Sequence, residues 1–201
     1  AAAWGLGIPR DLIRQALETF AGDLDKVPGR FNLFEINGAT VIVDYGHNTS
    51  SLQAMIEAIE QFPHERRLAV YSAAGDRRDG DMIRQGELLG EAFDHVYLYE
   101  DHYLRGRQPG EITRLFREGI DRGKRTGVIE DFRGSIRAVE AALKALQPGE
   151  LLLCQADVID ETCDFIKQYL TSDAAAREVG LGRALETSMN AALMLAGQIG
   201  D

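Results

Sequence analysis

The chain has 201 residues, of which 45% are hydrophobic, and a formal net charge of -10. This apolar content supports one real core and excludes a disordered segment, and the acidic balance excludes the clustered basic surface that nucleic-acid binding requires. Two cysteines are too few for a disulfide framework or a zinc site, and no apolar run or charged leader suggests a membrane span or export signal, so we expect a soluble cytoplasmic protein without membrane contact.

The first 28 residues predict two helical segments and a linker. Residues 1–20 begin as a helix, break at Gly5–Pro9, and continue as a helix. One side of that helix is apolar and consists of Leu12, Ile13, Ala16, Leu17 and Phe20. Residues 21–28 contain glycine, aspartates and proline, which indicate a linker between two packed units.

A β-hairpin follows the linker. Two alternating apolar runs, Phe31–Ile36 and Ala39–Val43, are joined by Asn37-Gly38. An Asn-Gly pair accepts the positive φ values of a type I′ turn, whose twist matches that of paired strands.

Polar residues end the second strand of this hairpin. The sequence Asp44-Tyr45-Gly46-His47-Asn48 is followed at once by a helical pattern. Open α/β sheets place ligand sites after strand C-termini. Turn and helix capping explain Asp44 or Asn48 taken singly, but the convergence of several polar residues on one edge favours a site.

Further strands and helices alternate downstream. The expected strands are Leu68–Ala73, Val96–Glu100, Thr126–Ile129 and Leu151–Cys154; the expected helices are Met82–Phe93, Gly110–Arg122, Ile136–Leu146 and Glu161–Leu170. This alternation predicts an α/β, Rossmann-like fold with a mainly parallel sheet flanked by helices, preceded by the hairpin. From Thr171 a helical pattern with Leu181, Leu185, Met189 and Leu193 on one face predicts packing or an oligomer contact.

Two nucleotide-binding motifs are missing. The phosphate-cradling pattern G-x-x-x-x-G-K-[ST] occurs nowhere, and Ala73–Asp79 after a predicted strand has one glycine where a dinucleotide fingerprint needs three. A nicotinamide dehydrogenase is therefore a poor interpretation, and any ATPase core would have to lie upstream.

Two motifs flank the hairpin: Gly29-Arg30-Phe31 before it and Asp44-Tyr45-Gly46-His47-Asn48 after it. This order resembles the opening of the C-terminal domain of the Mur ligase family. The resemblance implies three parts: residues 1–27 as the tail of a central ATPase domain plus linker, residues 28–170 as the C-terminal lid domain, and residues 171–201 as a helical extension. Thr49 stands where the family usually has proline, and a threonine can cap the helix that follows.

The same resemblance implies roles at the hairpin. Arg30 would contact ATP phosphates, since a guanidinium matches phosphate oxygens at all working pH values. Asp44 would accept hydrogen bonds from the nucleotide ribose, and His47 and Asn48 would line the catalytic cleft. The alternatives are a surface arginine paired with Asp23 or Asp25, and a histidine that serves a turn or packing.

The loop Glu100–Arg107 falls where related ligases select the incoming amino acid. Its mixed charges suit a zwitterion with a basic side chain: Arg105 or Arg107 for the carboxylate, Glu100 or Asp101 for a guanidinium. The acids Asp157, Asp160 and Glu161 follow the last strand, are similarly placed, and could meet the substrate amine. A solvated charged loop and helix capping are the alternatives.

The resemblance therefore implies one part of an ATP-dependent, amide-forming ligase that uses ATP and Mg²⁺, an amino acid such as arginine, and an acidic peptide or polymer acceptor. The metal would be held mainly by a central domain, so we expect no metal ligand in this chain and no activity from it alone. Another Mur-type ligase with a different amino acid, or a non-catalytic binding or oligomerisation module, are the alternatives.

Overall fold

The computed structural model describes residues 2–18, 26–172 and 176–179. The helices are α1 (Ala2–Gly5), α2 (Arg10–Glu18), α3 (Thr49–Ile59), α4 (Asp79–Ala92), α5 (Glu111–Ile120), α6 (Ser135–Ala145) and α7 (Ile159–Ser172). The strands are β1 (Asn32–Ile36), β2 (Ala39–Asp44), β3 (Arg67–Tyr71), β4 (His95–Glu100), β5 (Val128–Arg133), β6 (Leu151–Gln155) and β7 (Ala176–Val179).

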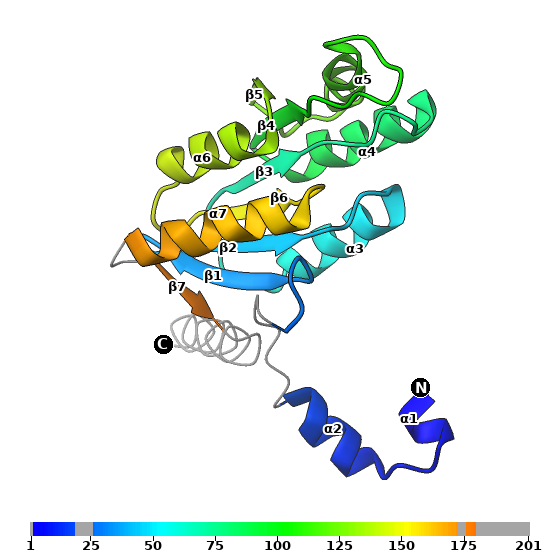
Figure 1. The fold of residues 1–201 in the computed structure, drawn as a ribbon, viewed down its shortest axis with the longest axis vertical. Coiled ribbons are helices and arrows are strands. Elements are labelled where there is room, and N and C mark those ends of the chain that lie inside the picture. Colours follow the sequence, from blue (N-terminus) through cyan, green and yellow to red (C-terminus); the bar gives the residue numbers. More distant parts are fainter. Residues whose placement is uncertain (1, 19–25, 173–175, 180–201) are drawn as a thin grey trace, which may run out of the picture.

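All the strands of the described residues form one sheet in the order β5-β4-β3-β6-β2-β1-β7 (Figure 1). The β2–β6, β3–β6, β3–β4 and β4–β5 pairs are parallel, while β1 is antiparallel to both β2 and β7. The predicted mainly parallel α/β sheet with an N-terminal hairpin is confirmed.

The hairpin turn has the predicted geometry. Asn37 and Gly38 take φ values of 52° and 76°, the left-handed pair that a type I′ turn requires. The strands pair in register from Asn32 opposite Val43 to Ile36 opposite Ala39. This register places Asp44 at the end of β2, one position beyond the residue that pairs with Asn32.

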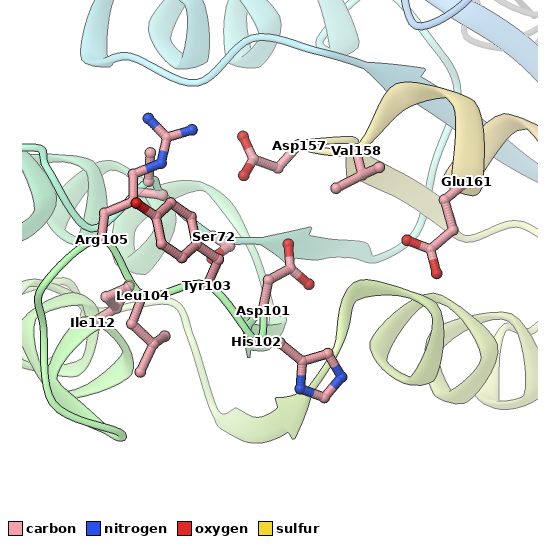
Figure 2. Close-up of a pocket in the computed structure, with 12 residues that line it drawn as sticks. Ser72, Asp101, His102, Tyr103, Leu104, Arg105, Ile112, Asp157, Val158 and Glu161 are labelled. Atoms are coloured by element: carbon pink, nitrogen blue, oxygen red, sulfur yellow. The ribbon is translucent and has the colours of Figure 1, made fainter.

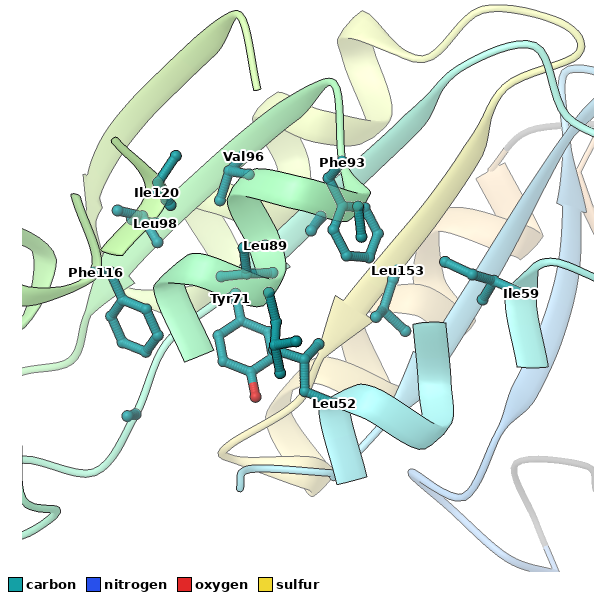
Figure 3. Close-up of a cluster of buried hydrophobic side chains, with 14 of the residues drawn as sticks. Leu52, Ile59, Tyr71, Leu89, Phe93, Val96, Leu98, Phe116, Ile120 and Leu153 are labelled. Carbon is teal, nitrogen blue, oxygen red and sulfur yellow. The ribbon is translucent and has the colours of Figure 1, made fainter. Parts of the chain in front are cut away.

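Helices cover both faces of the sheet and form two separate hydrophobic cores. Figure 1 shows α6 and α7 on the near face, where Val139, Leu143 and Ile166 are buried against the strands. Helices α3, α4 and α5 cover the other face, and Figure 3 shows Phe93 and Phe116 packed there around Tyr71 and Leu89. Fully burying one such side chain stabilises the fold by about 1.5–3 kcal/mol.

Two elements differ from the sequence prediction. Strand β5 runs over Val128–Arg133 instead of Thr126–Ile129 and forms one edge of the sheet, so its outward groups can be polar. The segment expected to be helical from residue 171 contains strand β7, which pairs with the free edge of β1. Helix α2 contains four of the five residues of the predicted N-terminal apolar face, Leu12, Ile13, Ala16 and Leu17. Phe20, and the predicted face of Leu181, Leu185, Met189 and Leu193, lie outside the described residues.

The four inner parallel strands, β2, β6, β3 and β4, end on the same edge of the sheet, called here the carboxyl edge. Strand β6 lies between β2 and β3, so the order of strands reverses beside β3, and such a switch point is where open α/β sheets bind ligands.

None of the described helices is both long and apolar enough to cross a membrane.

Candidate functional site

A pocket of about 300 Å³ opens on the carboxyl edge at the switch point. It is lined by the loops that follow β3, β4 and β6, and we call it the acidic pocket. Asp101, Arg105, Asp157 and Glu161 all line it, so four of the predicted amino-acid-binding residues meet at one place. Figure 2 shows the carboxylates of Asp101 and Asp157 reaching this space from the loops after β4 and β6, and that of Glu161 from the first turn of α7, with Arg105 on the other side.

The acidic pocket is electrostatically unbalanced. Burial raises the pKa of Asp101, and the negative charges of Asp157 and Glu161 raise it further, against a hydrogen bond from the Ser135 amide that lowers it. A raised carboxyl pKa means that the ionised form is disfavoured where it lies. A cation in this pocket would therefore relieve the repulsion among the three acids.

Arg105 is the positive group on this pocket. It takes a left-handed φ of 49°, and its guanidinium donates to Asp76 at 3.0 Å. Both partners of this ion pair are largely exposed, at 45% and 58%, so the pair contributes little stability and Arg105 can turn toward a ligand.

Glu100 does not face the acidic pocket. Its carboxylate is 3% exposed and accepts hydrogen bonds from the amides of Gly110 at 2.7 Å and Ile112 at 3.0 Å. These amides belong to the first turn of α5, whose N–H groups have no partner inside the helix. Glu100 thus caps α5, and its carboxylate is unavailable to a substrate in this arrangement.

The Arg107 side chain is also held by contacts within the fold. Its guanidinium donates to the carbonyl oxygens of Gly75 and Arg77 at 2.8 and 2.7 Å, and pairs with Asp79 and Glu111 at 2.6 and 2.7 Å. These contacts fasten the loop after β4 to the loop after β3. Four of the five N–H donors of Arg107 are therefore engaged within the fold, which leaves one on Nη1 for the substrate carboxylate that the sequence predicted.

Gly75 allows these two loops to touch. A Cβ atom at position 75 would lie 2.0 Å from the Leu104 carbonyl oxygen, which no side chain tolerates. The one glycine of the Ala73–Asp79 run is therefore required for the close approach that shapes the acidic pocket, and not for a dinucleotide phosphate.

Asp44 fastens the loop that carries Arg30. Its two carboxylate oxygens accept the amide of Phe31 at 2.9 Å and the amide of Gly46 at 2.6 Å. The Arg30 side chain is exposed, with its guanidinium carbon 5.1 Å from the centre of the Tyr45 ring and no ion pair among the described residues. Asp23 and Asp25, the alternative partners of Arg30, lie outside those residues.

His47 and Asn48 line a second hollow of about 240 Å³ on the same edge, beside Arg77 and Gln85. Asn48 caps α3: its Oδ1 accepts the Ser51 amide at 2.9 Å, so the capping alternative is realised for this side chain. Thr49 is the first helical residue and not the cap. The His47 ring lies edge-on to Tyr45, 4.6 Å between ring centres.

The sequence prediction missed Arg77. Its Nε atom is buried without a hydrogen-bond partner, and the side chain lines the hollow that holds His47 and Asn48. A buried donor without an acceptor is costly, so this atom is a candidate for contact with a bound anion. The signal was available in sequence, because Arg77 follows a predicted strand that ends at the site.

The described residues contain no group of three or more histidine, cysteine, aspartate or glutamate side chains placed to hold a metal ion. None of them is therefore assigned to Mg²⁺.

Two kinds of relative match most of this chain. Cyanophycin synthetase of Geminocystis herdmanii (strain PCC 6308) is 31% identical over 168 residues, which are 84% of this chain and 19% of the relative. The diaminopimelate-adding ligase of Alkaliphilus metalliredigens (UDP-N-acetylmuramoyl-L-alanyl-D-glutamate--2,6-diaminopimelate ligase) is 28% identical over 94% of this chain and 37% of the relative. The chain thus spans only a minor part of the length of these proteins.

Solved structures share the fold. The MurF ligase of Thermotoga maritima in complex with ADP is 23% identical, with a TM-score of 0.54 over 85% of this chain and 36% of that chain. The folylpolyglutamate synthase/dihydrofolate synthase of Yersinia pestis, complexed with AMPPNP and Mn ion, is 16% identical, with a TM-score of 0.58 over 79% of this chain and 35% of that chain. The model of the glutamate ligase domain of Mur ligases matches residues 29–157, which include every predicted site residue except Asp160 and Glu161, and the chain therefore belongs to the Mur ligase family.

Proposed function

We propose that this chain is the C-terminal part of an ATP-dependent ligase that joins an amino acid to a carboxylate, with arginine as the amino acid. The proposal rests on membership of the Mur ligase family and on similarity to cyanophycin synthetase. Residues 1–27 would belong to the preceding ATPase domain, and residues 28–170 would close over ATP bound there.

One observation carries the choice of amino acid: three acids and one exposed arginine converge on the acidic pocket. The substrate guanidinium would bind Asp101 and Glu161 through charge-assisted hydrogen bonds, and Arg105 would bind the substrate carboxylate. Asp157 adds to the negative field that attracts the cation. A neutral amino acid would leave the repulsion among these acids unrelieved.

In the proposed reaction a carboxylate of an acidic acceptor attacks the γ-phosphorus of ATP, forming an acyl phosphate and releasing ADP. The α-amine of arginine then attacks the acyl carbon, a C–N bond forms, the C–O bond to phosphate breaks, and the amine loses a proton. Arg30 would neutralise phosphate oxygens when the domains close, Asp44 would meet the ribose, and His47 and Asn48 would line the cleft. Mg²⁺ would be held outside this chain.

The test uses the full enzyme that contains this chain. Asp101→Asn and Glu161→Gln should each raise KM for arginine by about 10- to 150-fold, the equivalent of one charge-assisted hydrogen bond, without changing KM for ATP. Because folding raises the pKa of Asp101, its charge costs stability at neutral pH, so Asp101→Asn should not lower the melting temperature.

Glu140→Gln is the matched control, because Glu140 pairs with Lys144 on the surface of α6 away from the pocket. Lysine should compete poorly with arginine, since an ammonium cannot make a bidentate pair. Unchanged KM for arginine in both pocket variants would refute the amino-acid site. Preference for diaminopimelate over arginine would place the enzyme with the diaminopimelate ligases instead.

A further inference from the structure

The loop Val27–Phe31 that carries Arg30 is held on both sides by hydrogen bonds to its backbone. The Gly29 amide donates to Asn32 Oδ1 at 2.7 Å, and the Gly29 carbonyl accepts the Tyr45 amide at 2.9 Å. On the other side of Arg30, the Phe31 amide donates to Asp44. The backbone of Arg30 is therefore fixed while its side chain stays exposed.

This loop is held in a strained shape. Gly29 and Phe31, the two neighbours of Arg30, both take left-handed φ values, 66° and 52°. The left-handed region costs a bulky side chain such as phenylalanine about 1–2 kcal/mol. Such conformations persist only where the surroundings impose them, and they gather at functional sites.

Asn32 is the less expected part of this arrangement. It is the first residue of β1, it is 0% exposed, and the two residues that follow it, Leu33 and Phe34, belong to the hydrophobic cores. A buried amide costs stability unless its hydrogen bonds are satisfied, and an apolar residue would suit this strand position better. Its bonds to the loop, which include one from Nδ2 to the Val27 carbonyl oxygen at 3.2 Å, offset that cost.

We infer that Asn32 is a positioning residue for Arg30: it fixes the Val27–Phe31 loop so that the guanidinium points toward nucleotide phosphates when the domains close. The inference rests on the proposed function of Arg30. Ordering the loop before ATP arrives removes an entropy cost from the reaction, and a misplacement of about 1 Å is enough to cost up to 100-fold in rate.

A double-mutant cycle in the full enzyme tests this inference. Asn32→Leu keeps the size of the side chain and removes its hydrogen bonds, while Arg30→Ala removes the charge. Asn32→Leu should lower kcat by about 10-fold in the parent, within the range of such misplacements. In the Arg30→Ala background it should change kcat by less than about 2-fold, because no guanidinium remains to be positioned.

Asp94→Ala is the control for lost stability alone. Asp94 precedes β4, at the amino end of the strand and away from the carboxyl edge. Its carboxylate accepts one hydrogen bond from the Arg67 amide and two from the Arg125 guanidinium, so this variant should lower the melting temperature and leave kcat unchanged. KM for arginine should be unchanged in Asn32→Leu. If Asn32→Leu does not fold, the cycle is run with Asn32→Ser, whose side chain is too short to hold the loop.

The outcomes separate the two proposals. Equal losses of kcat from the Asn32 change in both backgrounds would make Asn32 merely structural and overturn the inference. Loss of rate in Arg30→Ala with none in the Asn32 variants would overturn the inference and leave the role of Arg30 standing. An unchanged rate in Arg30→Ala would overturn both.

Discussion

We expect the Glu100→Ala variant to unfold more easily than the parent and to bind substrate as well as the parent does. The change removes the acceptor of the Gly110 and Ile112 amides from a site where the carboxylate is 3% exposed. A hydrogen bond to a charged group is worth roughly 1.5–3 kcal/mol, and the partly exposed Gly110 recovers some of this from water. We therefore expect a loss of about 2–4 kcal/mol in the free energy of unfolding.

For a chain of this size each kcal/mol shifts the melting temperature by about 2–4 °C, so Glu100→Ala should melt about 5–15 °C below the parent. Thermal unfolding of the 201-residue chain, followed by circular dichroism, measures this shift. Glu140→Ala removes an exposed carboxylate from α6 and should melt within about 2 °C of the parent. A melting temperature equal to that of the parent, with a raised KM for arginine in the full enzyme, would return Glu100 to the substrate site and refute the capping role.

Three further predictions concern the loops, one histidine and the chain as a whole. Gly75→Ala would place a Cβ atom 2.0 Å from the Leu104 carbonyl and should raise KM for arginine by about 10-fold or more, whereas Gly80→Ala, with no atom within 4 Å, should leave it unchanged; equal KM values would show that the loop contact is dispensable. Burial lowers the pKa of His64, and its Nε2 accepts a hydrogen bond from Arg67 Nε at 2.6 Å. The neutral form of His64 therefore stabilises the fold. This stabilisation is complete above about pH 6.5 and is lost as the pH falls through the lowered pKa. His64→Gln should therefore reduce the fall in melting temperature between about pH 7.5 and about pH 5.5, and identical falls would contradict this. The purified 201-residue chain should hydrolyse no ATP because it lacks a phosphate-cradling loop, and Mg²⁺-dependent phosphate release would refute this.

Local patterns predicted most of the fold. The hairpin could be predicted because an Asn-Gly turn between alternating strands depends on neighbours in sequence. Strand β5 was misplaced because Glu130, Asp131 and Arg133 break the apolar pattern, and an edge strand needs only part of one face buried. Strand β7 owes its conformation to the β1 edge far away in sequence, so propensity alone favoured a helix.

The site was predictable as a region but not side chain by side chain. Glu100 and Asp101 are adjacent acids at a strand end, and successive side chains of an extended chain point to opposite sides, so one caps α5 and the other lines the pocket. The contacts of Arg107 within the fold were not predicted because two of its partners, the Gly75 and Arg77 carbonyl oxygens, lie 32 and 30 residues earlier. Sequence spacing does not reveal which charges are already neutralised by such distant contacts.

Strand β7 is the edge strand of the sheet beside β1. Its residues pair with Leu33–Ile36 and so cover the outer backbone groups of β1. A protease that cut the chain after Ser172 would leave the two hydrophobic cores intact but would bare that row of N–H and C=O groups. An exposed, apolar edge strand is a template for a strand of a second molecule. Removal of β7 should therefore expose a site for intermolecular strand pairing, and so for aggregation.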